Sequence, residues 1–291
     1  MKIGTMIKFN SSGQSNVTID DIERKFRELS ENGFDNCQFC SWLPSVWTDE
    51  NAEKINGFVK KYGVEISAFW CGWEGPNTWN FYDGQYTLGL VAPEYRAMRV
   101  KNLCDGADFA KKLGVTDVVT HMGFIPENPN DSNFMPMCIA IRTVAKHLEA
   151  NGQNLLFETG QETPVTMLRC FETVGCDNLF VNLDTANLIL YGKANPVDSL
   201  DVYGKYVRGI HAKDGHYPTN GHDLGREVKI GEGRVDFKAL FIRLHELGYD
   251  GCVTIEREVS SAAEENRDVL EARDYLRKII DEVYGGRKCL K

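Results

Sequence analysis

The segment VRGIHAKDG (207–215) places a short apolar run directly before His211, Lys213 and Asp214. An apolar run of this length that ends near glycine predicts a buried β-strand. A solvated turn could hold the three ionisable groups that follow it, and so could an active site. The choice depends on whether the other strands of the chain end in the same way, so this segment is the starting point for the fold.

Seven other segments have the same strand-like pattern, and helical patterns lie between them. The predicted strands are 2–9, 36–42, 65–73, 117–124, 154–160, 179–184, 207–214 and 252–258. The first predicted helix begins after Thr18, an N-cap residue with Asp21 three positions on, and stops at Gly33. Further helical patterns cover 95–114, 137–152, 237–248 and 262–283.

This alternation predicts an α/β fold, a (β/α)8 or TIM barrel, in which the whole chain (1–291) is one domain. No Pro- or Ser-rich linker divides the chain. The alternative is a doubly wound open sheet, which would need a glycine-rich phosphate turn after its first strand. The segment FNSSGQSN (9–16) has one glycine and no such motif, so the barrel is favoured.

The composition excludes several classes of protein. The net charge of −9 argues against a surface for nucleic acid or for an anionic membrane. The first residues, MKIGTMIKF, lack the apolar stretch of a signal peptide, and no run approaches the roughly 18 apolar residues of a membrane span. The nine cysteines are scattered, and we expect them to be reduced thiols in a cytoplasmic protein.

An ionisable residue lies near the end of each of four consecutive predicted strands. The apolar residues of these strands mark the face that packs against helices, so Glu158, Asp184, His211 and Glu256 point inwards at one mouth of the barrel. Three crowded carboxylates repel one another unless they are protonated or neutralised. A divalent cation neutralises them, and this donor set suits Mn²⁺, Mg²⁺ or Co²⁺. Taken singly, each residue also fits a salt bridge or a hydrogen-bonded core position.

Motifs around these four residues resemble those of a known family. They are FETGQE (157–162), NLDTANL (182–188), IHAKD (210–214), GEGRVDF (231–237) and TIERE (254–258). The chain resembles the xylose isomerase-like TIM barrel superfamily, and within it the sugar phosphate isomerase/epimerase-type proteins. Ketose 3-epimerases and keto-sugar epimerases look most similar, whereas inosose dehydratase and endonuclease IV are more distant members.

The resemblance implies one divalent metal ion, with Mn²⁺ foremost and Mg²⁺, Co²⁺ or Zn²⁺ as alternatives. Its ligands would be Glu158, Asp184, His211 and Glu256, and the two glutamates would also move protons to and from the substrate. One position departs from the family pattern, because many relatives have histidine where this chain has Asn187. Endonuclease IV needs additional histidines for its zinc cluster, and the negative charge opposes DNA binding, so a nuclease is set aside.

Five further residues are predicted to contact the substrate: His121, Gln161, Asn187, Lys213 and Trp70. His121 and Lys213 share the inward face of their strands, although Lys213 could instead pair with Asp214. Gln161 follows the fifth strand, where it could reach sugar hydroxyls or cap the next helix.

Two loops are predicted lids over this mouth. The aromatic stretch 70–86 suits stacking on a sugar, and it also suits a subunit interface. The polar loop 215–235 is the second lid. The segment EVSSAAEEN (258–266), after the eighth strand, is acidic and lacks the glycines of a phosphate site, which favours an unphosphorylated sugar.

These features predict an isomerase, namely a metal-dependent epimerase of a keto sugar. It would remove and return a proton next to a carbonyl through an enediolate. The alternatives are an aldose–ketose isomerase, a metal-dependent lyase or dehydratase acting on a keto sugar or inosose, and a sugar-binding barrel without catalysis. The expected partner is a small-molecule sugar, and a homodimer or homotetramer is compatible with the sequence.

Overall fold

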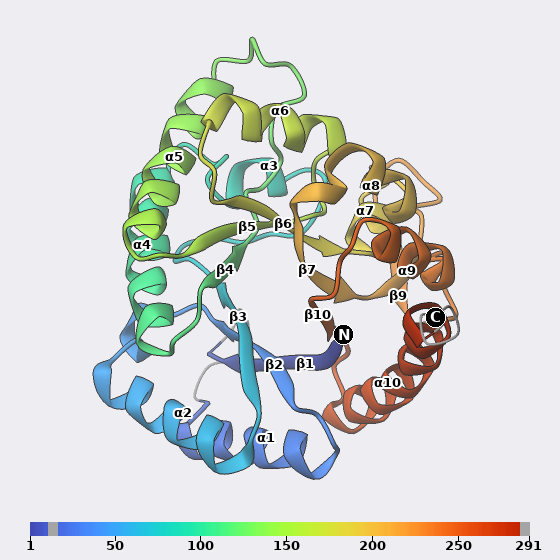
Figure 1. The fold of residues 1–291 in the computed structure, drawn as a ribbon. Helices are drawn as coiled ribbons and strands as arrows, with labels where there is room; N and C mark the ends of the chain where they lie inside the picture. The colour runs from blue at the N-terminus through green and yellow to red at the C-terminus, as the bar shows by residue number, and fades with distance from the viewer. Residues whose placement is uncertain (11–16, 286–291) are drawn as a thin grey trace.

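The computed structural model describes residues 1–10 and 17–285, and in this part of the chain eight parallel strands close into a barrel (Figure 1). Around the barrel the order is β1-β10-β7-β6-β5-β4-β3-β2. The strands are β1 (Lys2–Phe9), β2 (Asn36–Ser41), β3 (Glu65–Cys71), β4 (Asp117–Thr120), β5 (Asn154–Glu158), β6 (Leu179–Asp184), β7 (Val207–Ala212) and β10 (Cys252–Ile255). The predicted TIM barrel is confirmed, and the open sheet is excluded.

Helices surround the barrel (Figure 1). They are α1 (Ile19–Glu31), α2 (Asp49–Tyr62), α3 (Gly84–Thr87), α4 (Arg96–Lys112), α5 (Phe134–Ala150), α6 (Pro164–Val174), α7 (Asn187–Leu190), α8 (Pro196–Tyr203), α9 (Phe237–Glu246) and α10 (Ala262–Gly285), with short 3₁₀ turns η1 (Pro44–Val46) and η2 (Gly204–Tyr206). The predicted cap of α1 is present: Thr18 accepts from the Asp21 amide, and the Asp21 side chain accepts from the Thr18 amide.

Several strands are shorter in the structure than the sequence predicted. The structure ends β4 at Thr120, β5 at Glu158 and β10 at Ile255, before the ends predicted from the sequence. Beyond these points the chain leaves the ladder of the neighbouring strand and turns into a loop. The last residues of the predicted strands therefore belong to the loops around the barrel mouth.

Apolar side chains form two cores, one outside the barrel wall and one inside it. Leu155 and Phe157 of β5 belong to the large core against the helices, whereas Leu156 belongs to a small core with Val119. Ile255 of β10 is also in the outer core. Since side chains alternate along a strand, the residues that follow Phe157 and Ile255 face inwards, as the sequence predicted.

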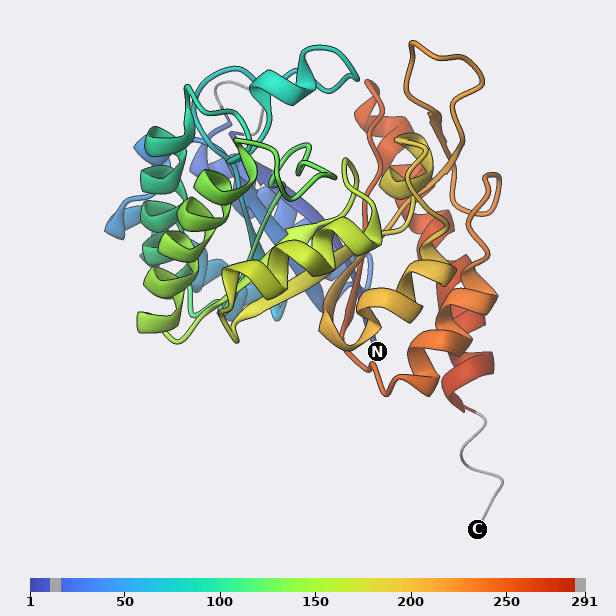
Figure 2. The same cartoon turned by 90° about the horizontal axis from the view of Figure 1, so that it is seen from above.

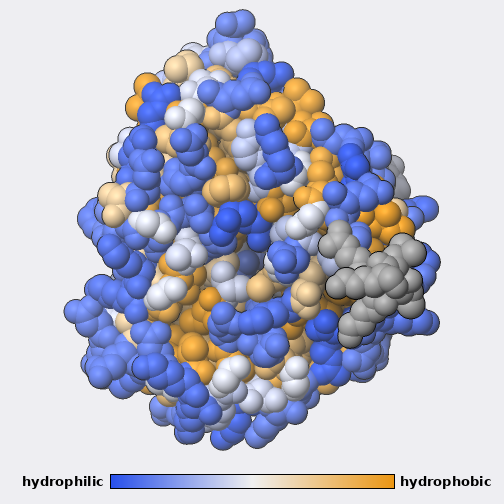
Figure 3. All heavy atoms as spheres, viewed as in Figure 1, coloured by the Kyte–Doolittle hydropathy of each residue, from blue (hydrophilic) through white to orange (hydrophobic). Residues whose placement is uncertain are grey.

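An additional hairpin lies outside the barrel. It begins at Asp214, which was predicted to end the strand 207–214, and continues into the predicted loop 215–235; β7 itself ends at Ala212. The hairpin pairs β8 (Asp214–His216) with β9 (Arg226–Val228) in antiparallel register. Figure 2 shows the segment between these strands on the same side as α3, at the end of the barrel away from the N-terminus. The face that carries the N-terminus is mostly hydrophilic at its rim, with patches of apolar residues between (Figure 3).

Asp214 anchors this hairpin and the turn before α9. Its Oδ1 accepts hydrogen bonds from the amides of Gly215 (2.8 Å) and Val235 (3.1 Å). Its Oδ2 accepts from the amides of Gly231 (3.0 Å) and Gly233 (2.9 Å). A Cβ on Gly233 would lie 2.0 Å from Oδ1, so only glycine permits this approach. Asp214 is therefore a structural residue.

Two general features complete the fold. The eight cysteines in the described part of the chain are free thiols, and Cys289 lies outside it. Among residues 1–10 and 17–285, no helix has both the length and the apolar character needed to span a membrane.

Candidate metal centre and substrate pocket

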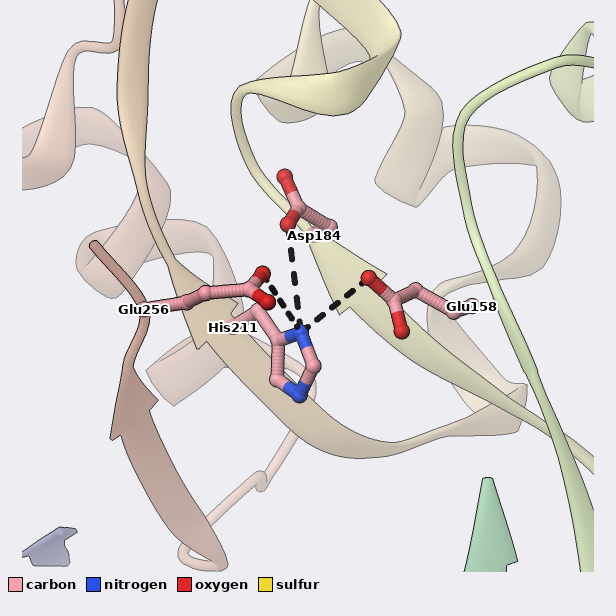
Figure 4. A group of neighbouring side chains, drawn as sticks. All are labelled: Glu158, Asp184, His211 and Glu256. Carbon is pink, nitrogen blue, oxygen red and sulfur yellow. Dashed lines mark hydrogen bonds and ion pairs between the residues drawn. The ribbon is translucent and has the colours of Figure 1, made fainter. Parts of the chain in front are cut away.

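Four ionisable side chains meet at the mouth of the barrel away from the N-terminus. Glu158 and Asp184 are the last residues of β5 and β6, His211 lies in β7, and Glu256 directly follows β10. One ligand atom from each lies within 4.8 Å of the other three, and each of the four side chains is at most 10% exposed. The structure thus brings together the four predicted ligands, as Figure 4 shows.

His211 is at the centre of this group. Its Nδ1 lies 3.2 Å from Glu158 Oε1, 3.2 Å from Glu256 Oε2 and 3.8 Å from Asp184 Oδ2. Glu158 and Glu256 approach this nitrogen from opposite sides (Figure 4). Three carboxylate oxygens and one imidazole nitrogen facing one point form a donor set for a divalent cation.

Asp184 provides a direct test of whether a cation fits. Its Oδ1 accepts hydrogen bonds from the amides of Ala186 (2.9 Å) and Asn187 (2.7 Å). Its Oδ2 is buried and has no hydrogen-bond partner among the described residues. A buried polar atom without a partner is costly, and here it faces the other three ligand atoms, so the residues fit a bound cation.

Burial and repulsion also favour a cation. Burial raises the pKa of Asp184 well above its usual value, and the charges of Glu256 and Glu158 add to this effect. Burial opposes the ionisation of Glu158 too, but His121 and His211 outweigh it and hold the pKa of Glu158 below its usual value. The three carboxyl groups do not all ionise readily by themselves, and a divalent ion would let them do so together.

A cavity of about 380 Å³ opens beside this cluster. It is lined by Met6, Lys8, Cys40, Trp42, Trp70, Trp79, His121, Glu158, Gln161, Asn187, Leu190, Tyr191, Lys213, Leu224, Glu256 and Glu258. All five predicted substrate contacts are among these residues. A second cavity, of about 460 Å³, lies between α1 and the start of α10 and touches none of the four ligand residues.

Three of the predicted substrate contacts hold Glu158 in place. The Nε1–H of Trp70 donates to Glu158 Oε2, and the Asn187 amide donates to Oε1 at 3.3 Å. His121 Nε2 also lies 3.3 Å from Oε1. Gln161 differs, because neither of its buried side-chain polar atoms has a hydrogen-bond partner among the described residues. Gln161 does not cap α6, whose N-cap is Thr163.

Lys213 pairs with Glu258 instead of Asp214. Its Nζ lies 2.6 Å from Glu258 Oε2 and 3.5 Å from Glu256 Oε2. Burial opposes the ionisation of Glu256, but the positive charges of Lys213 and His211 outweigh this effect and hold the pKa of Glu256 well below its usual value. Glu258 was missed from the sequence, but it follows Glu256 by two residues, and the period of two places it on the same face.

Gln38 of β2 was also missed. Its Oε1 accepts a hydrogen bond from His211 Nε2 at 2.6 Å. The signal in the sequence is its position between Cys37 and Phe39, which both belong to the outer core, so that Gln38 must face inwards.

Aromatic residues cover one side of the cavity, and a contact joins the two predicted lids. The ring centroid of Trp42 lies 5.0 Å from that of Trp70, and Trp79 lies 5.0 Å from the His121 ring. The Tyr82 hydroxyl lies 2.5 Å from Nδ1 of His222, which links the loop after β3 to the loop between β8 and β9.

The fold and this cluster agree with a family-level match. A model of the family described as "Xylose isomerase-like TIM barrel" matches residues 26–279. The chain belongs to the xylose isomerase-like TIM barrel family. The matched residues include all four members of the cluster and seven of the eight barrel strands.

Individual proteins are similar to this chain over different shares of their own length. A xylose isomerase domain protein from Planctomyces limnophilus has a solved structure that is 28% identical, with a TM-score of 0.88, over 97% of this chain and 98% of that one. An L-ribulose 3-epimerase from Mesorhizobium japonicum is 26% identical over 272 residues, 88% of this chain and 80% of the relative. An uncharacterized protein from Methanocaldococcus jannaschii is 27% identical over 199 residues, 65% of this chain and 66% of the relative. Four of the curated relatives are matched over only 35% to 66% of their own length.

Proposed function

We propose that this protein is a divalent-metal-dependent epimerase of a keto sugar. The observation that carries the proposal is the group of three carboxylates and one imidazole beside a cavity with both polar and aromatic walls. The similarity to an L-ribulose 3-epimerase over most of the chain supports it.

The ion would be held by Glu158, Asp184, His211 and Glu256. Three oxygen donors and one nitrogen donor favour Mn²⁺, with Mg²⁺, Co²⁺ and Zn²⁺ as alternatives. When bound, such an ion polarises a carbonyl group and makes the neighbouring C–H bond more acidic.

Proton transfer would be the role of Glu158 and Glu256. The two carboxylates come from β5 and β10, with β6 and β7 between them, and both line the cavity. They are not equivalent, because Glu158 receives hydrogen bonds on both oxygens. No hydrogen bond from a described residue reaches Oε1 of Glu256. Glu256 is therefore the freer base, and Glu158 acts on the opposite face of the substrate.

The charges of the cavity favour a neutral sugar. Its lining has three carboxylates, Glu158, Glu256 and Glu258, against two ammonium groups, Lys8 and Lys213. Lys213 is already paired with Glu258 at 2.6 Å. A bound divalent ion would offset Glu158 and Glu256, but among the described residues the lining contains no arginine and one of its two lysines is already paired, so its side chains offer a phosphate group little free positive charge. The tryptophan faces suit the C–H surface of a neutral sugar.

The test is a keto-sugar panel followed by NMR in D₂O. Chelation should abolish turnover, added Mn²⁺ should restore it, and the epimerised carbon should carry deuterium. With Mn²⁺ shown to remain bound, Glu256→Gln should lower turnover by about 10²- to 10⁴-fold, the usual contribution of general acid–base catalysis. The matched control is Glu258→Gln, the same change two residues on, which should cost far less. Product without solvent deuterium would indicate a hydride shift and would contradict the epimerase mechanism.

A further inference from the structure

Gln38 makes a hydrogen bond across the interior of the barrel. It lies in β2, whereas its partner His211 lies in β7, and β1 and β10 separate the two strands in the barrel wall. Both side chains are buried, with Gln38 2% and His211 0% exposed. The distance of 2.6 Å between Gln38 Oε1 and His211 Nε2 is short and well within hydrogen-bonding range.

This bond fixes which imidazole nitrogen keeps its proton when the ring binds a cation. A carbonyl oxygen only accepts, so Nε2 must be the donor. A neutral imidazole has one N–H and one lone pair, and with the proton on Nε2 the lone pair is on Nδ1. That nitrogen is the one that faces the oxygens of Glu158, Glu256 and Asp184 at 3.2, 3.2 and 3.8 Å.

The other tautomer would work against metal binding. With the proton on Nδ1, the ring would donate to Glu158 or Glu256 and occupy the point where a cation would sit. Ring rotation would likewise withdraw Nδ1 from the carboxylates. An acceptor on the far side of the ring disfavours both arrangements, and partners of this kind orient histidine ligands in many metal sites.

We infer that Gln38 is a positioning residue for the metal centre: its side-chain oxygen holds His211 with Nε2 protonated and Nδ1 directed at the three carboxylates. The inference rests on the proposed metal dependence and goes beyond it, because Gln38 would touch neither the ion nor the substrate. It also explains why a polar amide is buried next to the inner core of the barrel, where an amide without a partner would be destabilising.

Mn²⁺ binding tests the inference without a substrate. The dissociation constant is measured by electron paramagnetic resonance of free Mn²⁺ for wild type, Gln38→Met and Gln38→Glu. Methionine has a similar size but no acceptor oxygen, so we expect binding about 10- to 100-fold weaker. Glutamate keeps an acceptor oxygen and should bind at least as tightly as wild type. The matched control is Asn36→Ala, which removes another buried amide two residues earlier on the same face without contacting His211, and it should leave the constant unchanged.

A second readout follows the imidazole itself. In ¹⁵N-histidine-labelled, Mg²⁺-loaded protein, His211 should show a protected Nε2–H signal in wild type, and Gln38→Met should expose this proton to exchange. If Gln38→Met does not fold by circular dichroism, Gln38→Asn, which withdraws the oxygen by one methylene, is measured with the same expectation. Unchanged affinity and an unchanged Nε2–H signal in a folded variant would overturn the inference alone. A wild-type protein that binds no Mn²⁺ would instead overturn the proposed metal dependence, and this inference with it.

Discussion

Replacing Asp214 by asparagine should destabilise the fold without touching the metal ligands. Asparagine keeps the shape of the side chain and one acceptor oxygen, which can still serve Gly215 and Val235. Its Nδ2 would face the amide N–H groups of Gly231 and Gly233, which now donate to Oδ2 at 3.0 and 2.9 Å. The NH₂ group of the asparagine would then face two backbone N–H donors, and neither hydrogen bond could form.

The expected size follows from these two lost bonds. A hydrogen bond to a charged acceptor contributes about 1.5–3 kcal/mol to stability. The Gly231 and Gly233 bonds are only partly buried, so the lower end applies to each. The free energy of unfolding should therefore fall by about 3 kcal/mol, twice the lower estimate for one bond.

Urea unfolding followed by circular dichroism measures this change, with a chelator present because a bound metal would itself stabilise the protein. The matched control is Asp236→Asn. Asp236 caps α9 by accepting from the Ala239 amide at 2.9 Å, and asparagine caps a helix as well as aspartate does. The control should therefore change stability by less than about 0.5 kcal/mol. A loss below about 1 kcal/mol for Asp214→Asn, or one no larger than that of the control, would refute the reasoning.

Three further predictions concern the site. Asp184→Asn should weaken Mn²⁺ binding by more than about 100-fold, since changing residues that only orient ligands already costs about 10- to 100-fold. Its apo stability should not fall, because asparagine Oδ1 still accepts from the Ala186 and Asn187 amides and the repulsion between carboxylates is relieved; a clear drop in the apo melting temperature would contradict this. Burial raises the pKa of the Glu162 carboxyl group to about 7, whereas its pKa in the unfolded chain is near 4.5. Between these two pH values the unfolded chain releases the proton and the folded protein retains it, so the folded protein loses stability as the pH rises through this range. Glu162→Gln should consequently stabilise the chelated protein by about 2 kcal/mol more at pH 8 than at pH 5, and a gain independent of pH in urea unfolding would rule out this cause. Tyr82→Phe removes the hydroxyl that meets His222, and it should speed amide hydrogen exchange in 217–225, whereas Tyr86→Phe should not; equal exchange in both variants would show that the contact does not hold the loop.

The sequence by itself determined the barrel and the direction of its key side chains. Eight strand–helix units in one chain permit few architectures, and side chains alternate between two faces along every strand. Phe157 and Ile255, which pack outwards, were therefore enough to place Glu158 and Glu256 inside. This information is local, because the face of a residue depends on its immediate neighbours in the chain.

Only the tertiary structure decided which inward side chains bond to one another. Gln38 meets His211 although 173 residues separate them, and Lys213 selects Glu258 over the adjacent Asp214. Asp214 turned out to anchor a hairpin whose second strand is formed by Arg226–Val228. Each of these pairs depends on the order in which the strands close the barrel and on how far each strand runs before it leaves the sheet. The alternation of side chains within one strand gives neither the strand order nor the point at which each strand ends. These partners could therefore be identified only from the tertiary structure.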